Sequence, residues 1–189
     1  MPPRRTADIT LNGRVPRPLT CGDIERAARS FLKTLQVSKA QISIVFLDPR
    51  SMRRLNLEFL GHDYVTDVVT FDLGSERSGT RDKGQGTGRA KRKGKENSFL
   101  SICSRRSFPC PMSHVPCHLN GEIYICPSQA RKNARLFDAP FREEVLRYLA
   151  HGLLHLSGLD DATPDERRHM TSSEDRLLGS FLSGPALLT

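Results

Sequence analysis

The sequence contains no tryptophan and no long apolar run. No stretch approaches the roughly 18 apolar residues of a membrane-spanning helix, and the opening residues MPPRRTADITLNG have no apolar signal-peptide core. We therefore expect a cytoplasmic protein without membrane association. Hydrophobic residues make up 37% of the 189 positions, which suffices at this length for one core of leucine, isoleucine, valine and phenylalanine. Wholesale disorder is excluded.

Cysteine is scarce, with five residues in the chain. An odd number without a secretion signal does not favour a disulfide framework, so we expect reduced thiols. One segment combines metal-ligating residue types but lacks the short Cys-x-x-Cys spacing of zinc sites: Cys103, Cys110, His114, Cys117 and His118. We interpret this segment as a reduced loop and not as a second zinc site.

Acidic residues are outnumbered, since 21 Asp and Glu stand against 29 Lys and Arg, for a net charge of +8. Between Gly74 and His118, ten basic residues face three acidic ones, so this segment holds a surplus of seven. Residues 75–98 are also rich in glycine and serine, which is typical of a mobile loop. We predict a single domain over residues 1–189 with a basic low-complexity insertion at about residues 74–118. The charge suggests an anionic partner such as nucleic acid.

Hydrophobic periodicity outside this insertion predicts an α+β fold without internal repeats. Strands are expected at residues 7–15, 41–48, 65–73 and 120–126, and helices at 22–36, from 49, from 127, and at 140–156 and 164–182. Asp23 is the expected cap of the first helix, and Pro49 lies just inside the second.

The helix expected at residues 140–156 carries two histidines on one face. His151 and His155 lie four residues apart, which places their side chains about 40° apart around the helix axis. Leucines and a valine form the opposite stripe, which we expect to face the core: Val145, Leu146, Leu149, Leu153 and Leu156. The two histidines are therefore positioned to share a metal ion.

Gly158 follows the helix at a position where a left-handed residue ends a helix and lets the chain fold back. The turn brings Asp160 or Asp161 toward the histidines, at a spacing like that of the extended zincin motif. We predict a metal site formed by His151, His155 and Asp161, although the spacing does not choose between the two aspartates. Three protein ligands leave one position for water, which is typical of catalytic metal sites. The expected chemistry is metal-assisted hydrolysis.

The residue after the first histidine is Gly152, whereas zinc peptidases place a glutamate general base there. Peptidase activity is therefore disfavoured.

Three segments in order resemble the bacterial YbeY-type rRNA maturation factors, over about residues 5–73 and 119–182. They are the His151 to Asp160 segment HGLLHLSGLD, the segment from Leu55-Asn56 through Gly61 and Asp63 to TDVVTF at 66–71, and Gly121-Glu122-Ile123. The resemblance implies a zincin-like α+β domain with a small mixed sheet packed with helices. It also implies a metal-dependent, single-strand-specific endoribonuclease of rRNA maturation that binds one Zn²⁺, or another divalent transition metal, and acts on rRNA or a ribosomal subunit.

The chain departs from the family pattern at two positions. Asp161 replaces the third histidine, and Leu60 replaces an arginine expected between Phe59 and Gly61. A carboxylate ligand makes the site less positive and tolerates harder metals, although zinc remains the first choice. The missing arginine removes a candidate for holding a phosphate.

Two alternatives to the nuclease stay open. In the first, the chain is a non-catalytic, metal-binding ribosome-assembly or RNA-binding factor. In the second, it is a zinc hydrolase that acts on a substrate other than RNA. Thr66-Asp67 is interpreted as a strand-end hydrogen-bonding pair and His169 as a surface residue. The basic run at residues 89–95 is either solvated or in contact with phosphates. Oligomeric state is not predicted.

Overall fold

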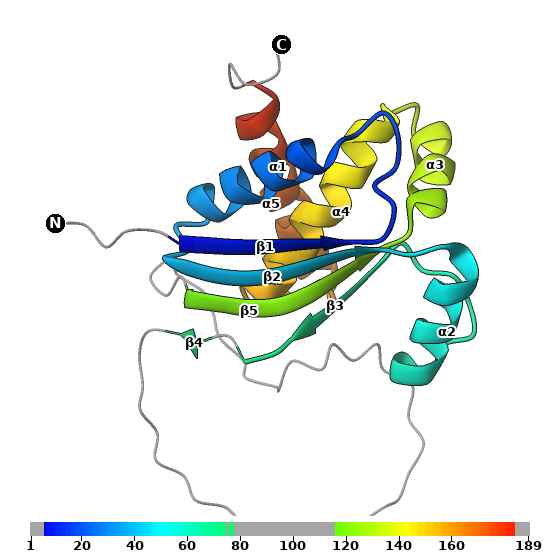
Figure 1. Cartoon of the computed structure of the whole chain (residues 1–189), viewed down its shortest axis with the longest axis horizontal. Coiled ribbons are helices and arrows are strands. Elements are labelled where there is room, and N and C mark those ends of the chain that lie inside the picture. Colours follow the sequence, from blue (N-terminus) through cyan, green and yellow to red (C-terminus); the bar gives the residue numbers. More distant parts are fainter. Residues whose placement is uncertain (1–5, 75, 78–115, 184–189) are drawn as a thin grey trace, which may run out of the picture.

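The computed structural model describes residues 6–74, 76–77 and 116–183 (Figure 1). The elements are β1 (Thr6–Asn12), α1 (Cys21–Thr34), β2 (Lys39–Phe46), α2 (Pro49–Leu60), β3 (Val68–Asp72), β4 (Glu76–Arg77), β5 (Pro116–Ile125), α3 (Pro127–Leu136), α4 (Phe141–Leu156) and α5 (Pro164–Leu182). This arrangement confirms the predicted α+β class.

The sheet is mixed, as predicted. Its strand order is β1-β2-β5-β3, and the short β4 also pairs with β5. β1, β2 and β5 run parallel, with Ile42 opposite Gly121, whereas β3 runs antiparallel to β5, with Phe71 opposite Glu122. β5, from the second half of the chain, thus pairs with β2, β3 and β4, which all come from the first half.

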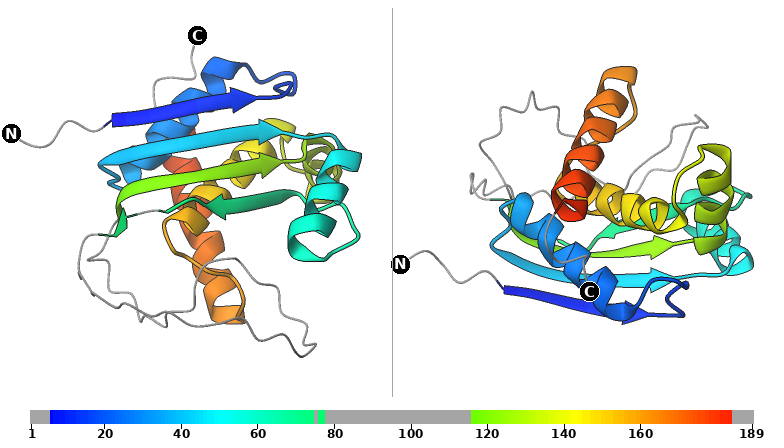
Figure 2. Two further views of the ribbon diagram at one scale, coloured as in Figure 1. Left: turned by 60° about the horizontal axis from the view of Figure 1, so that its bottom comes forward. Right: turned by 90° about the horizontal axis from the view of Figure 1, so that it is seen from above.

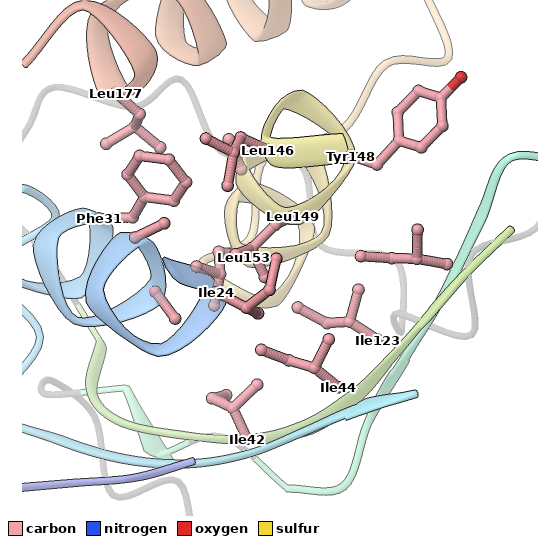
Figure 3. Close-up of a cluster of buried hydrophobic side chains, with 14 of the residues drawn as sticks. Ile24, Phe31, Ile42, Ile44, Ile123, Leu146, Tyr148, Leu149, Leu153 and Leu177 are labelled. Carbon is pink, nitrogen blue, oxygen red and sulfur yellow. The ribbon is translucent and has the colours of Figure 1, made fainter. Parts of the chain in front are cut away.

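The two faces of the sheet are covered differently (Figures 1 and 2). Alternate side chains of β2 and β5 point toward α1, α4 and α5 and are fully buried among them, including Ile44 and Ile123 (Figure 3). The intervening residues of β5, such as Glu122 and Tyr124, lie on the opposite face. α2 covers only one end of that second face, where Met52 packs with Val69. We call these the closed face and the open face.

Helix α4 lies close against the closed face because two glycines leave room for it. A Cβ atom added to Gly121 of β5 would lie 2.5 Å from Leu156 Cδ2, and one added to Gly152 of α4 would lie 2.7 Å from Ile123 Cγ2. The predicted core stripe of α4 is buried at every position. The opposite side of the helix, with its two histidines, therefore faces outward beside β3.

Several predicted boundaries are wrong by a few residues. α1 is capped by Thr20, whose side chain accepts from the Asp23 amide, and Asp23 occupies the third helical position of a capping box. β3 begins at Val68 and not at residue 65. β5 begins four residues before the predicted strand, at Pro116, and residues 76–77 pair with it although they fall within the expected loop. Long-range pairing, which local patterns do not encode, sets these strand ends.

Most of the predicted insertion lies outside the described residues, as do Cys103, Cys110 and His114 of the segment weighed as a second zinc site, whereas Cys117 and His118 belong to β5. Cys21 and Cys126, the two cysteines whose side chains are described, are free thiols. In the described part of the chain, no helix has the length and apolar character needed to cross a membrane.

Candidate metal centre

His151 and His155 lie one turn apart near the end of α4, and their side chains are 22% and 20% exposed. The rings are nearly perpendicular, with centroids 4.4 Å apart. Their Nε2 atoms approach to 2.9 Å. The spacing of four residues therefore converges the two imidazoles on one point, as predicted from the helix geometry.

Each ring is held through its other nitrogen. His151 Nδ1 lies 2.8 Å from Oε1 of Glu174 on α5, and His155 Nδ1 lies 3.0 Å from the carbonyl oxygen of Leu159. Both partners are acceptors, so each Nδ1 carries the proton and each Nε2 presents a lone pair. This is the arrangement in which outer groups fix the tautomer and orientation of metal-ligating histidines.

The chain folds back after α4 at Gly158, which has φ +95°. The amides of Gly158 and Leu159 donate to the carbonyl oxygens of His155 and Leu154, closing the helix as the sequence predicts. Beyond this turn, the two carboxylate oxygens of Asp161 lie 4.0 Å from the Nε2 atoms of His151 and His155 respectively. The fold thus assembles the three predicted ligands.

The neighbouring aspartate has a different role in this turn. Asp160 Oδ1 accepts a hydrogen bond from the Asp161 backbone amide at 2.8 Å. Arg167 of α5 donates to the carbonyl oxygens of Asp161 and Ala162, at 3.1 and 3.0 Å. These contacts hold the turn so that Asp161, and not Asp160, faces the histidines.

The electrostatics of the two histidines differ. Burial disfavours the charged form of His151, but the Glu174 carboxylate outweighs this effect and raises its pKa. The pKa of His155 is lowered, first by burial and then by the adjacent His151. Protonation of one ring thus opposes protonation of the other.

The donor set fits a divalent metal ion. Two lone pairs facing each other at 2.9 Å repel unless a proton or cation lies between them. A tetrahedral ion with ligands at about 2.1 Å holds them about 3.4 Å apart, which lies between the observed 2.9 and 4.0 Å separations. Two imidazoles and one carboxylate suit zinc and other transition metals.

Glu174 belongs to a network of charged residues centred on Arg147. The Arg147 guanidinium lies 3.4 Å from a carboxylate oxygen of Glu174, 2.7 Å from one of Asp175 and 3.8 Å from one of Glu144. Glu144 is 6% exposed, and burial raises its pKa. This network anchors the carboxylate that holds His151.

The position after the first histidine explains why a peptidase base is absent. Gly152 faces Ile123 and Thr70, whose Oγ1 atom would lie 3.1 Å from an added Cβ. The close packing of α4 on the sheet leaves no room for a glutamate side chain at this position. That the site does not belong to a peptidase stays a prediction.

The other residues considered from the sequence fall around the site. Asp67 Oδ1 accepts from Thr66 Oγ1 and the Val68 amide, which confirms the strand-end pair, and its charge also acts on His151. Leu60 ends α2 and packs into the apolar cluster of the open face. His169 is exposed, as predicted.

Sequence reasoning missed Glu174 and Arg167. Glu174 is 7% exposed although it carries a charge. It lies on the same helical stripe as Met170, Leu177 and Phe181, which are all buried. A glutamate on the apolar stripe of an amphipathic helix was the available signal.

Comparison with known proteins agrees with this geometry. The family model for endoribonuclease YbeY matches residues 18–182. The chain belongs to the YbeY family. The endoribonuclease YbeY of Salinibacter ruber is 29% identical over 188 residues, which cover 98% of this chain and 99% of that protein. The endoribonuclease YbeY of Chlorobium phaeovibrioides is 31% identical, with 90% and 88% of the two chains covered.

The family assignment also agrees with the fold. A protein of Thermotoga maritima whose structure was solved in solution superposes with a TM-score of 0.53 over 96% of each chain, at 20% identity. The small mixed sheet with α4 across one face is therefore a YbeY-like architecture, as the sequence resemblance implies.

Proposed function

We propose that this chain is a metal-dependent endoribonuclease whose metal ligands are His151, His155 and Asp161. The observation that supports this most directly is the convergence of two oriented Nε2 atoms and one carboxylate on a single point. Family membership supplies the reaction class, because the curated relatives carry the name endoribonuclease.

We propose Zn²⁺ as the metal, one ion per chain, because imidazole and carboxylate ligands in a three-residue set suit it. When bound, such an ion supplies Lewis acidity toward a phosphoryl oxygen and lowers the pKa of coordinated water. The carboxylate of Asp161 makes the site less positive than three imidazoles would, so Mn²⁺ or Co²⁺ also fits the ligand set.

The residues around the ligands orient them. Glu174 and the Leu159 carbonyl hold the two Nδ1 protons, which keeps both Nε2 atoms available. Arg167 holds the backbone of the Asp161 turn. These contacts preserve the ligand geometry without reorganisation when RNA binds.

The proposed substrate is single-stranded RNA, with rRNA or a ribosomal subunit as its source and the cytoplasm as the compartment. The positive net charge favours binding of a polyanion. The family's role in rRNA maturation, carried over from its three matching motifs, makes ribosomal RNA the substrate to test first.

One observation favours a non-catalytic assembly factor as the second candidate. Leu60 stands where the family carries an arginine, and its side chain packs with the apolar residues of the open face. The described structure therefore places no cation at this point to hold a phosphate. Under this alternative the metal stabilises the fold and the protein binds RNA without cleaving it.

The test measures bound metal and RNA cleavage on the same preparation. We expect about one transition metal per chain and cleavage that a chelator stops. His155→Ala and Asp161→Ala should lose both metal and cleavage, because the two remaining ligands do not hold a metal ion at a three-ligand site. Asp160→Asn keeps the acceptor oxygen for the Asp161 amide, so it is the matched control and should keep both.

Three results separate the candidates. Full metal occupancy in the His151→Ala/His155→Ala double variant would refute the ligand assignment. Loss of metal in Asp160→Ala but not in Asp161→Ala would move the third ligand to Asp160. Metal-replete wild-type protein that binds RNA without cleaving it, together with a Leu60→Arg variant that gains cleavage, would favour the assembly factor.

A further inference from the structure

The open face of the sheet contains a groove that the metal site does not use. Its volume is about 240 Å³, and α2, β3 and β5 each contribute to its lining. The lining residues that matter below are Leu55 and Phe59 from α2, Phe71 and Asp72 from β3, and Glu122 and Tyr124 from β5. We call this the aromatic groove.

Three rings form a connected series along the aromatic groove. Phe59 meets Phe71 edge to face, with centroids 5.2 Å apart, and Phe71 meets Tyr124 in the same way at 5.7 Å. Phe59 remains 54% exposed at the outer end of the series. A large exposed ring fixed by edge contacts offers a flat surface on which another ring stacks.

Two carboxylates stand beside these rings. Glu122 lies opposite Phe71 across the β3–β5 pair, and its Oε2 accepts from the Tyr124 hydroxyl at 2.7 Å. Asp72 follows Phe71 directly on β3 and accepts from the Gly74 amide. Carboxylates accept hydrogen bonds from the amino groups of nucleobases.

The aromatic groove and the metal site lie on opposite faces of the sheet, on the two sides of β3. β3 is the last strand in the described order, and its side chains alternate between the two faces. Thr70 points toward Gly152, next to His151, whereas Phe71 points into the groove. A single strand of RNA that crosses β3 therefore reaches both faces within a few nucleotides.

Positive charge on α2 is suited to the phosphates of such a strand. α2 carries three exposed arginines, Arg50, Arg53 and Arg54. Arg53 is paired with Asp63 at 2.7 Å. Among the described residues, Arg50 and Arg54 form no ion pair, which leaves their charge available to a polyanion.

We propose that the aromatic groove is a nucleobase subsite. A base of single-stranded RNA stacks on Phe59, its amino group donates to Asp72 or Glu122, and the backbone crosses the edge of β3 toward His151. Stacking on aromatic rings is the general way in which proteins hold unpaired bases. The proposal rests on the RNA substrate of the proposed function and adds where a base is held.

The absence of tryptophan from the chain provides a direct test. The Phe59→Trp variant places the chain's single tryptophan in the aromatic groove, where it is excited selectively over the three tyrosines. The full-length, metal-replete protein is titrated with AMP, GMP and CMP. We expect saturable quenching by all three and none by ribose 5-phosphate, which has no base. Leu57→Trp, also on α2 and 49% exposed but outside the groove, is the matched control and should show no saturable quenching.

A second measurement uses RNA itself. Phe59→Ala should weaken binding of a single-stranded oligonucleotide about tenfold or more, because it removes one stacking surface. Phe59→Tyr should restore the affinity, and the metal content of all variants should equal that of the wild type. Unchanged RNA affinity in Phe59→Ala, or quenching by ribose 5-phosphate equal to that by the nucleotides, would overturn the subsite.

Failure of the subsite and failure of the enzyme are distinguishable. Nucleoside monophosphates contain no phosphodiester bond, so the quenching does not depend on cleavage. A wild-type protein that never cleaves RNA but shows base-specific quenching keeps the subsite and loses the nuclease. A dimer in sedimentation that dissociates in Phe59→Ala would instead assign the aromatic groove to a second copy of the chain.

Discussion

The two faces of one sheet serve different purposes in this molecule. On the closed face, α1, α4 and α5 bury a continuous apolar cluster that includes Ile44, Ile123 and Leu149. On the open face, α2 buries only a small cluster around Met52, and Phe59 and Leu73 remain more than half exposed. The proposed metal ligands belong to the closed face, and the aromatic groove belongs to the open face.

The difference shows how a small domain keeps its metal ligands rigid on one face of the sheet and leaves the other face accessible to a substrate. Metal ligands need fixed geometry, and α4 obtains it from a core that surrounds most of the helix. A single-stranded substrate needs exposed rings and charges, and the open face has them because no second layer of helices covers it in the described structure. Variants on the two faces should therefore affect different measurements.

The largest stability difference should come from leucines on opposite faces. Leu149→Ala removes a fully buried side chain of α4 and should lower the free energy of unfolding by about 2 to 5 kcal/mol. Leu55→Ala removes a half-buried side chain of the open face and should lower it by about 1 kcal/mol. Urea unfolding followed by circular dichroism measures both, and equal losses would contradict the division into a closed and an open face.

The next effect concerns the contact between Glu174 and His151, which orients the His151 ring. Glu174→Leu removes the acceptor of His151 Nδ1 and should weaken metal binding about 10- to 100-fold. Glu174→Gln keeps an acceptor oxygen and should reduce the metal affinity less than Glu174→Leu does. Metal affinity is measured by competition with a chromogenic chelator, and the optical spectrum of the cobalt-loaded protein reports the ligand geometry.

The control for Glu174 is its neighbour on α5. Asp175→Asn alters an exposed residue that shares Arg147 with Glu174, and it should leave metal affinity unchanged. If Glu174→Leu and Asp175→Asn behave alike, then the charge network and not the contact to His151 sets the affinity.

Alanine substitutions at two glycines should change the free energy of unfolding in opposite directions, by a smaller amount. Gly152→Ala places a Cβ 2.7 Å from Ile123 Cγ2, and overpacking of this kind should cost about 1 to 3 kcal/mol. Gly179→Ala on α5 meets no atom within 4 Å and should stabilise the protein by up to about 1 kcal/mol. Thermal unfolding that moves in the same direction for both would show that α4 does not pack against the sheet at Gly152.

What the sequence predicts well is encoded locally. The start of α2 follows from Pro49, which lies in its first turn as predicted. The convergence of His151 and His155 follows from their spacing on one helix. In each case the deciding residues lie within one or two turns of one another.

What it misses depends on pairing between distant segments. The first residues of β5 have no strand pattern of their own, and pairing with β4, in which Arg77 lies opposite Pro116, extends the strand to its first residue. Glu174 reaches His151 across 23 positions, so only the packing of α5 on α4 reveals the contact. The single-domain arrangement with a basic insertion at 74–118 stays a prediction.

The smallest expected effect lies at the start of α1, a helix of the closed face. Thr20 Oγ1 accepts from the Asp23 amide, and the Asp23 carboxylate accepts from the Thr20 amide and hydroxyl. Thr20→Ala removes the cap and should lower the free energy of unfolding by about 1 kcal/mol at pH 7. Thr163→Ala, in the equivalent capping box of α5, should have a similar effect.

The pH dependence of this loss identifies its origin. Burial opposes ionisation of Asp23, but the hydrogen bonds from Thr20 and the charges of Arg142 and Arg26 outweigh it and lower its pKa below the usual 3.8. A carboxyl whose pKa is lower in the folded state contributes fully above its unfolded pKa, and the contribution disappears as pH falls through the folded pKa. The wild type should therefore lose its advantage over Thr20→Ala in acid. A gap that is equal at pH 7 and pH 3 in urea unfolding would show that the hydroxyl alone, without the Asp23 carboxylate, caps α1.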